Sequence, residues 1–183
     1  NRGAQIIIPH AFAALDVTAY FDTLTANFIE GAIKNRLTLS NVWLGGVTAG
    51  GYAGIDFAAD NALGAGSKTY YEQRYKLFGD SSDSRSNGTS TRVATATPDT
   101  VPAQVALRLV IVPGSGYRTY ISVDGTNPTT EVSAIYNIFQ QSTYATAESS
   151  HVAGAIQIGL GQTAATAADL SVRLTNFVVN SAS

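Results

Sequence analysis

The sequence contains neither cysteine nor methionine, and only 13% of its 183 residues are charged. The absence of cysteine excludes disulfides, thiolate chemistry and cysteine-ligated zinc. With 11 basic and 13 acidic residues the formal net charge is −2. No Lys/Arg cluster stands out, which argues against nucleic acid or an anionic membrane surface as a partner. No apolar run approaches the roughly 20 residues that span a bilayer, so we expect no membrane insertion.

Small and hydroxyl-bearing residues take the place of the lysine and glutamate that are typical of a cytosolic helical protein. This composition suits a β-rich protein on a cell or virion surface, and we expect an extracellular or virion-surface location. The length predicts one domain over residues 1–183. The chain starts with Asn1, and we expect a processed terminus or an engineered boundary there.

The clearest pattern lies between Val101 and Asn127, where two alternating apolar runs flank a turn at residues 113–116. In the second run, Arg118, Tyr120 and Ser122 share the face opposite the odd-numbered residues. Alternation with period two across a Pro-Gly-Ser-Gly break predicts an antiparallel hairpin. Asp124-Gly125 then predicts a second tight turn.

Similar short runs recur along the chain, and about ten strands at this spacing predict an all-β antiparallel β-sandwich or barrel. The segment 11–20 is ambiguous between a short helix and an edge strand. Pro9 is expected to end the strand 5–8. Val172 and Leu174 alternate on one parity and Phe177 on the other, which predicts a bulge near Thr175. The other expected strands cover residues 26–30, 35–39, 52–57, 69–78, 92–97, 130–139 and 151–160.

The order of three segments resembles the concanavalin A-like lectin/glucanase superfamily and its laminin G-like relatives. They are GGYAGIDFAADN (Gly50–Asn61), TYYEQRY (Thr69–Tyr75) and VALRLVIVPGSGYRTYISVDG (Val105–Gly125). The segments AGAIQIGLG and DLSVRLTNFVV look like the closing strands of the same fold. The resemblance spans about residues 29–180 and implies an antiparallel sandwich of the concanavalin-like jelly-roll type. A shared fold implies less about activity.

Catalytic motifs of that superfamily are missing here. The Glu-x-Asp-x-x-Glu run of the glucanases has no counterpart, and Gln157-Ile158-Gly159 lacks the histidine of the lyase-like Gln-Ile-His motif. Asp56 and Glu72, on neighbouring expected strands, come nearest to a carboxylate pair for glycoside hydrolysis. Exposed strand carboxylates usually only solvate a face. We therefore expect no enzyme, and we interpret His10 and His151 as strand-end or surface residues.

Aromatic side chains beside polar ones give the positive indication of function. Sugar rings stack on aromatic side chains, while amides, carboxylates and guanidinium groups bind the hydroxyls. Tyrosine also packs at sheet edges with its hydroxyl in water, so each residue alone is weak support. The sequence predicts a non-catalytic carbohydrate-binding or adhesion module, with a glycan as partner. Its expected ligand-binding residues are Trp43, Tyr70, Glu72, Arg74, Arg118 and Tyr120.

Several turns are rich in the oxygen atoms that Ca²⁺ prefers. The aspartates concerned are Asp60, Asp80, Asp83 and Asp124. None has EF-hand spacing, and a polar loop explains residues 79–90 better than a calcium site does. We expect no cofactor other than this optional calcium ion.

The alternative function is a structural or decoration subunit of a virus particle or surface filament, with neighbouring subunits as partners. Residues 1–9 carry the apolar run Ile6–Ile8 and could form an arm that adds as a strand to a neighbour. The same residues could equally be the first strand of the chain's own sheet.

Overall fold

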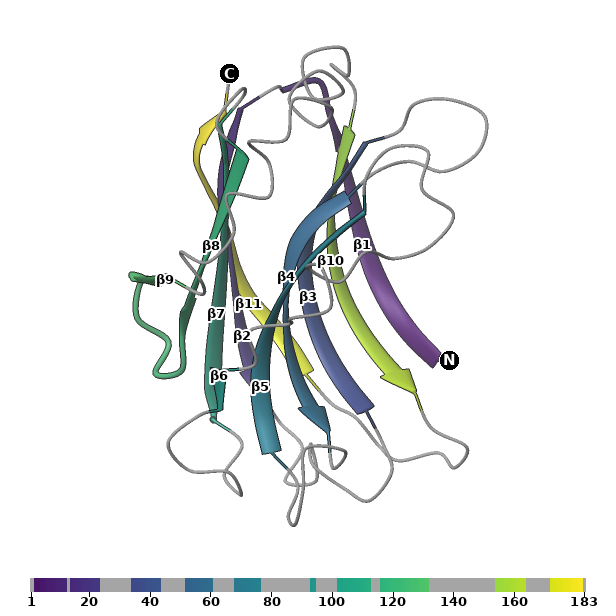
Figure 1. Ribbon diagram of the computed structural model, residues 1–183, viewed down its shortest axis with the longest axis vertical. Coiled ribbons are helices and arrows are strands. Elements are labelled where there is room, and N and C mark those ends of the chain that lie inside the picture. Colours follow the sequence, from purple (N-terminus) through teal and green to yellow (C-terminus); the bar gives the residue numbers. More distant parts are fainter. Residues whose placement is uncertain are drawn as a thin grey trace.

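Two antiparallel β-sheets face each other in the computed structural model (Figure 1). The structure describes residues 2–12, 14–23, 34–43, 52–60, 68–76, 93–94, 102–112, 116–131, 154–163 and 172–182. All regular elements in these ranges are strands. The same ranges contain no helix long and apolar enough to cross a membrane.

The larger sheet, sheet A, has six strands, in the order β1-β10-β3-β4-β5-β6. Their bounds are Arg2–His10 (β1), Gly154–Thr163 (β10), Lys34–Trp43 (β3), Tyr52–Asp60 (β4), Lys68–Lys76 (β5) and Val93–Ala94 (β6). The smaller sheet, sheet B, has five strands, in the order β11-β2-β7-β8-β9. Their bounds are Val172–Ala182 (β11), Leu15–Thr23 (β2), Gln104–Val112 (β7), Gly116–Ser122 (β8) and Thr130–Glu131 (β9).

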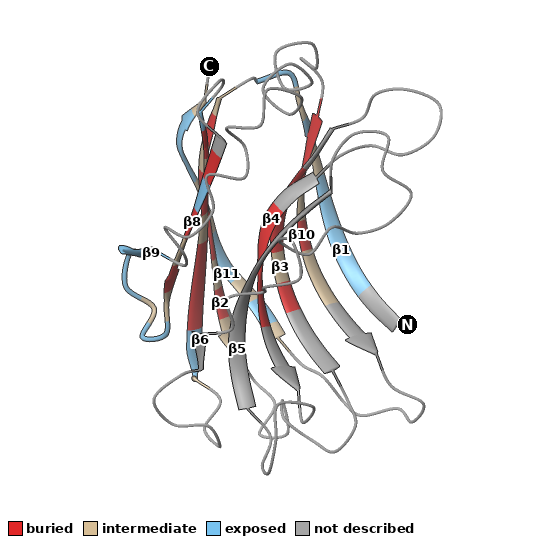
Figure 2. Ribbon diagram, in the orientation of Figure 1, coloured by how far each residue is buried: buried red, intermediate tan, exposed pale blue. Residues whose placement is uncertain are grey.

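The core lies between the sheets because alternate residues of each strand point inward. Figure 2 shows the buried residues concentrated on the facing strands, with β1 largely exposed. The fold is therefore an all-β antiparallel β-sandwich, as the sequence predicts. Its largest fully buried side chains are Phe57, Leu37, Leu39, Ile55, Leu107, Leu109, Ile111 and Val17.

The hairpin predicted between Val101 and Asn127 is confirmed. Strands β7 and β8 pair antiparallel, with Leu109 opposite Thr119 and Val112 opposite Gly116. Tyr117 and Ile121 are buried, while Arg118 is exposed on the other face. The alternation of apolar and polar residues therefore predicted both the pairing of β7 with β8 and the face of the hairpin that points into the core.

The bulge predicted near Thr175 is also confirmed, because the pairing of β11 with β2 shifts register between Leu174 and Asn176. A second shift, between Val179 and Ser181, was not predicted. Each extra residue bends the strand and re-aims the side chains that follow it.

One local prediction was wrong, and one open alternative is decided in favour of a strand. Strand β1 continues through Pro9 to His10 and pairs with β10 over its full length, so residues 1–9 contain the first strand of sheet A. Proline lacks an N–H donor but is tolerated at an edge, where one side of the strand has no partner. The ambiguous segment 11–20 contributes to strand β2. The expected strand 26–30 and most of 130–139 lie outside the described residues.

Candidate functional site on the outer sheet faces

The sandwich presents two polar outer faces, one on each sheet. Residues on these faces alternate with the core residues along every strand. On sheet B the side chains of β2, β7, β8 and β11 are described almost completely. On sheet A the backbone register is described across all six strands, with side chains along parts of β1, β10, β3 and β4.

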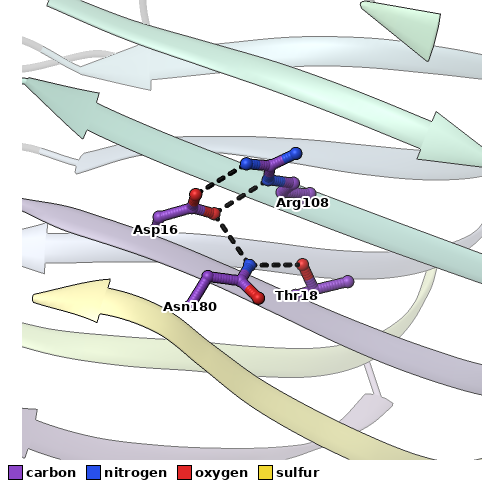
Figure 3. Close-up of polar contacts among 4 residues, drawn as sticks. All are labelled: Asp16, Thr18, Arg108 and Asn180. Atoms are coloured by element: carbon purple, nitrogen blue, oxygen red, sulfur yellow. Dashed lines mark hydrogen bonds and ion pairs between the residues drawn. The ribbon is translucent and has the colours of Figure 1, made fainter. Parts of the chain in front are cut away.

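An ion pair joins two neighbouring strands on the outer face of sheet B (Figure 3). Arg108 on β7 donates a hydrogen bond from Nε to Oδ1 of Asp16 on β2, at 2.8 Å, and another from Nη2 to Oδ2, at 2.6 Å. Both side chains are mostly buried, with exposed fractions of 25% for Arg108 and 15% for Asp16. Two parallel hydrogen bonds fix the orientation of both groups as well as their separation.

The second bulge of β11 completes this network. Asn180 is the extra residue between Val179 and Ser181, and its Nδ2 donates to Oδ1 of Asp16 at 2.9 Å and to Oγ1 of Thr18 at 3.3 Å. The bulge therefore connects the edge strand to the ion pair. Hydrogen bonding from Arg108, and secondarily from Asn180, holds the pKa of Asp16 below its usual range, against the opposing effect of burial.

Tyr120 on β8 extends the network toward the sheet edge. The guanidinium carbon of Arg108 lies 5.2 Å from the centre of the Tyr120 ring, a cation–π distance. Hydrogen bonding to Asp16 raises the pKa of Arg108, so the cation is permanent. The network can thus hold a half-buried tyrosine in a fixed position beside a positive charge. We call Asp16, Thr18, Arg108, Tyr120 and Asn180 the sheet B network.

Asp56 is the central residue on the outer face of sheet A. It lies on β4 opposite the core side, yet only 1% of it is exposed. Thr38 on β3 donates a hydrogen bond from Oγ1 to Oδ1 of Asp56 at 2.7 Å. On the other side, Glu72 of β5 is the register partner of Asp56. The sequence predicts these two residues on neighbouring strands, and the register pairs Asp56 with Glu72.

Polar groups continue across this face toward β1. The Nε2 of Gln157 on β10 donates to Oε1 of Gln5 on β1 at 2.6 Å. Between Thr38 and Gln5 in the same row lies Gly159. A Cβ at Gly159 would meet only the Cβ of Thr38, at 3.6 Å, so the space above this glycine is open. We call Gln5, Gln157, Gly159, Thr38 and Asp56 the sheet A polar strip.

The structure divides the six predicted ligand-binding residues among three places. Tyr70, Glu72 and Arg74 of β5 pair with Ala58, Asp56 and Gly54 and thus lie on the outer face of sheet A. Arg118 and Tyr120 lie on the outer face of sheet B. Trp43, at the end of β3, has the parity of the core residues Leu37 and Leu39. No single surface contains all six.

The sequence did not single out Asp16, Thr18 or Asn180. Asp16 and Arg108 are far apart in the chain, and only the pairing of β2 with β7 brings them together. Asn180 depends on a bulge that alternation did not indicate. The available signal was the opposite charge of two outward-facing strand positions, which becomes informative only when the register is known.

Among the predicted calcium ligands, only the side chain of Asp124 is described. Its Oδ1 accepts hydrogen bonds from Oγ of Ser122 at 2.6 Å and from the backbone N and Oγ1 of Thr126 at 3.0 and 2.6 Å. These bonds lower the pKa of Asp124 to about 2. Asp60 ends β4, and Asp80 and Asp83 lie outside the described residues. Within the described ranges no three His, Asp or Glu side chains form a metal-binding group.

His10 ends strand β1 and has a structural environment. Its Nδ1 accepts a hydrogen bond from the backbone N of Phe12 at 3.0 Å, so the ring proton is on Nε2, which lies 2.6 Å from Oδ1 of buried Asn41. Both ring nitrogens therefore have partners, which agrees with the interpretation of His10 as a strand-end residue. His151 lies outside the described residues.

The chain matches no protein-family model, and no curated protein matches it either. A functional assignment therefore depends on the geometry of the two faces.

Proposed function

We propose that the protein is a non-catalytic carbohydrate-binding or adhesion module of an extracellular or virion surface, and that its glycan lies on the outer face of sheet A. The observation that carries this proposal is the sheet A polar strip. It aligns amide and hydroxyl groups of three neighbouring strands, beside the buried Asp56 of a fourth, on the face to which the register also assigns Tyr70, Glu72 and Arg74.

The chemistry of the strip suits sugar hydroxyls. An amide side chain donates and accepts, and the Thr38 hydroxyl, which donates its proton to Asp56, keeps lone pairs that accept. Gln157 and Gln5 orient each other through their 2.6 Å hydrogen bond, and the hydroxyl of Thr38 is oriented by its hydrogen bond to Asp56. Groups held in place by one another lose little conformational entropy when a ligand binds.

The missing side chain at Gly159 leaves a depression in the surface of the sheet A polar strip. Neighbouring strands lie about 4.8 Å apart, so Thr38 and Gln5, two strands apart, flank a gap of roughly 10 Å. A sugar ring above Gly159 would reach the hydroxyl on one side and the amides on the other. The resemblance to concanavalin-like jelly rolls agrees with a glycan at a sheet face. We therefore also propose that the strands of the sandwich follow the concanavalin-like jelly-roll topology.

A non-catalytic role follows from the same residues. The carboxylate of Asp56 is almost inaccessible and accepts a hydrogen bond from Thr38. Gly159 occupies the position at which the lyase-like motif has a histidine, so no base extends from this point of β10. Reducing-end release and unsaturated-product absorbance on a polysaccharide panel should both be negative.

A glycan array with the purified chain, with and without Ca²⁺, is the primary test. Two tyrosine variants then locate the ligand, because they lie on opposite faces: Tyr70→Ala should reduce binding at least tenfold, whereas Tyr120→Ala should leave it unchanged. Gly159→Leu should also abolish binding by filling the gap. Loss in Tyr120→Ala alone would move the site to sheet B. A blank array would reject the proposal.

Calcium dependence has its own interpretation in this test. Asp60 is the last residue of β4 and Asp124 lies in the turn after β8, so neither belongs to the sheet A polar strip. Binding that needs Ca²⁺ and fails in Asp124→Asn would place the glycan at a turn. Binding that is insensitive to chelator would favour the strip.

A structural or decoration subunit remains the second candidate, and the edge strand β1 favours it. Ile6 and Ile7 are 48% and 47% exposed on this strand, which has no charged residue between Arg2 and His10. Natural sheets usually protect such edges with charges or bulges.

The test of this second role is a substitution and not a deletion, because β1 pairs with β10 over nine positions. Ile7→Lys should abolish assembly, measured by sedimentation, and leave the monomer folded. The matched control is Val179→Lys, on the edge strand of the other sheet. A wild-type chain that stays monomeric at all concentrations would exclude self-assembly through β1.

A further inference from the structure

An apolar cleft lies between the two sheets, beside the edge strands β1 and β11. It has a volume of about 160 Å³ and is lined by residues of five strands. The lining residues within the described part of the chain are Ala4, Gln5, Ile6, Phe21, Leu37, Ile158, Gly159, Leu160, Val172 and Leu174. None of these is charged, and Gln5 is the only polar one.

The cleft exists because a small residue stands where a large one would close the core. In one inward-facing row, Ala4 on β1 is followed by Leu160 on β10, Leu37 on β3 and Phe57 on β4. The last two are fully buried, but Leu160 is only partly covered. Ala4 leaves the end of that row open.

The opposite wall also remains partly open. Val172 and Leu174 on β11 are partly buried hydrophobic residues that pack against the edge of the core cluster. Ile6 on β1, in the adjacent inward row, is 48% exposed. Apolar groups from both sheets therefore line a space that connects with solvent along the side between β1 and β11.

We infer that this cleft is a binding site for one small uncharged apolar molecule, such as an aromatic ring or a short alkyl chain. The volume of the cleft limits the ligand to a molecule smaller than a typical drug, because drug-sized ligands occupy pockets of about 300–1,000 Å³. A dry cavity of about 150 Å³ lined by Leu, Ile and Phe accepts a single benzene. The lining excludes an ionised ligand, whose charge would be buried without a partner. Gln5 and Gly159 belong both to this lining and to the sheet A polar strip, so the two proposed sites share parts of strands β1 and β10. The other lining residues do not belong to the strip.

The experiment uses the full chain with ¹³C-labelled Ile, Leu and Val methyl groups, titrated with benzene. Saturable shifts should appear at the methyls of Ile158, Leu160, Val172 and Leu174, with none at the exposed methyls of Val112. Ala4→Phe should fill the cleft and weaken the apparent affinity at least tenfold. Ile7→Phe adds the same ring to the outer face of β1 and should leave the affinity unchanged.

Leu174→Phe provides a second filling variant from the opposite sheet, should Ala4→Phe fail to fold. Absence of saturation in the wild-type chain would overturn the inference, as would shifts that persist in both filled variants. Methyl spectra that change with protein concentration before benzene is added would place a side chain of a second copy in the cleft, and would also overturn it. None of these outcomes depends on glycan binding.

Discussion

Asp16 and Arg108 are diagonal neighbours across β2 and β7, and Arg108 donates two hydrogen bonds of 2.8 and 2.6 Å to the Asp16 carboxylate. The pair lies on the outer face of sheet B and is about four-fifths covered. Asn180 connects it to β11, and the Tyr120 ring adjoins it from β8. One ion pair thus joins four strands of this sheet.

Replacement of Arg108 should destabilise the protein far more than replacement of a surface arginine. Arg108→Met keeps most of the aliphatic stem but removes both Arg108 hydrogen bonds to Asp16, so that among the described side chains Asn180 is left as donor, at an expected cost of about 2–3 kcal/mol. Arg118 on the neighbouring strand is 69% exposed and lies 4.0 Å from Glu131, so Arg118→Met should cost at most about 0.5 kcal/mol. Urea unfolding of both variants gives the comparison. Equal losses would contradict the structural role of the ion pair.

Acidification should remove the contribution of Asp16. Its pKa in the folded protein lies below the reference value of 3.8, mainly through Arg108, so the folded state favours the ionised form. That stabilisation is complete above pH 3.8 and disappears as the pH falls through the lower folded pKa. The difference in unfolding free energy between wild type and Asp16→Asn should therefore shrink below about pH 4. In an Arg108→Met background the same comparison should show a weaker dependence on pH.

Gly54 should tolerate no side chain, in contrast to Gly159 on the same face. A Cβ at Gly54 would lie 2.5 Å from the Cβ of Ser40 and 2.6 Å from the carbonyl oxygen of Leu39. Gly54→Ala should cost at least about 2 kcal/mol, since the crowding involves backbone. At Gly159 the nearest atom would be 3.6 Å away, so Gly159→Ala should keep the unfolding free energy within about 1 kcal/mol. Thermal melts of the two variants distinguish the sites.

Asp124 should titrate at an unusually low pH for an exposed carboxylate. Its pKa is about 2 because Ser122 and Thr126 donate hydrogen bonds to the charged form. In a carboxyl ¹³C titration, Ser122→Ala should move the midpoint upward toward 3.8. A midpoint that Ser122→Ala leaves unchanged would mean that the turn does not form in solution.

Much of the fold could be predicted from the sequence, because the alternation of apolar and polar residues along a strand is a local property. Arg118 and Tyr120 on one face and Tyr117 and Ile121 on the other follow from period two alone, and so does the bulge after Leu174. A one-residue slip would expose an entire core face, so these positions are strongly determined. Pro9 misled this reasoning, since its effect depends on whether β1 has a partner on one side or on both.

The candidate sites were harder to predict from the sequence, because they combine residues of strands that are far apart in the chain. The sequence predicted that Arg118 and Tyr120 share an outer face, which is confirmed, and the register assigns Tyr70, Glu72 and Arg74 to the outer face of the other sheet. The sequence could not divide these residues between two sheets. The Asp56–Glu72 pairing was inferred from two strands that follow each other in the chain. Asp16 and Arg108, separated by 92 positions, gave no comparable signal.

The sequence by itself determined that this chain forms strands, which side chains of each strand face the core, and that cysteine and cysteine-ligated zinc chemistry are absent. These properties depend on neighbours in the chain and on composition. The tertiary structure alone decided that β10 lies between β1 and β3, that Asn180 reaches Asp16, and that Ala4 leaves a cleft between the sheets. Each of these depends on which strands pair and in what register, and pairing is a long-range choice set by the packing of the whole core.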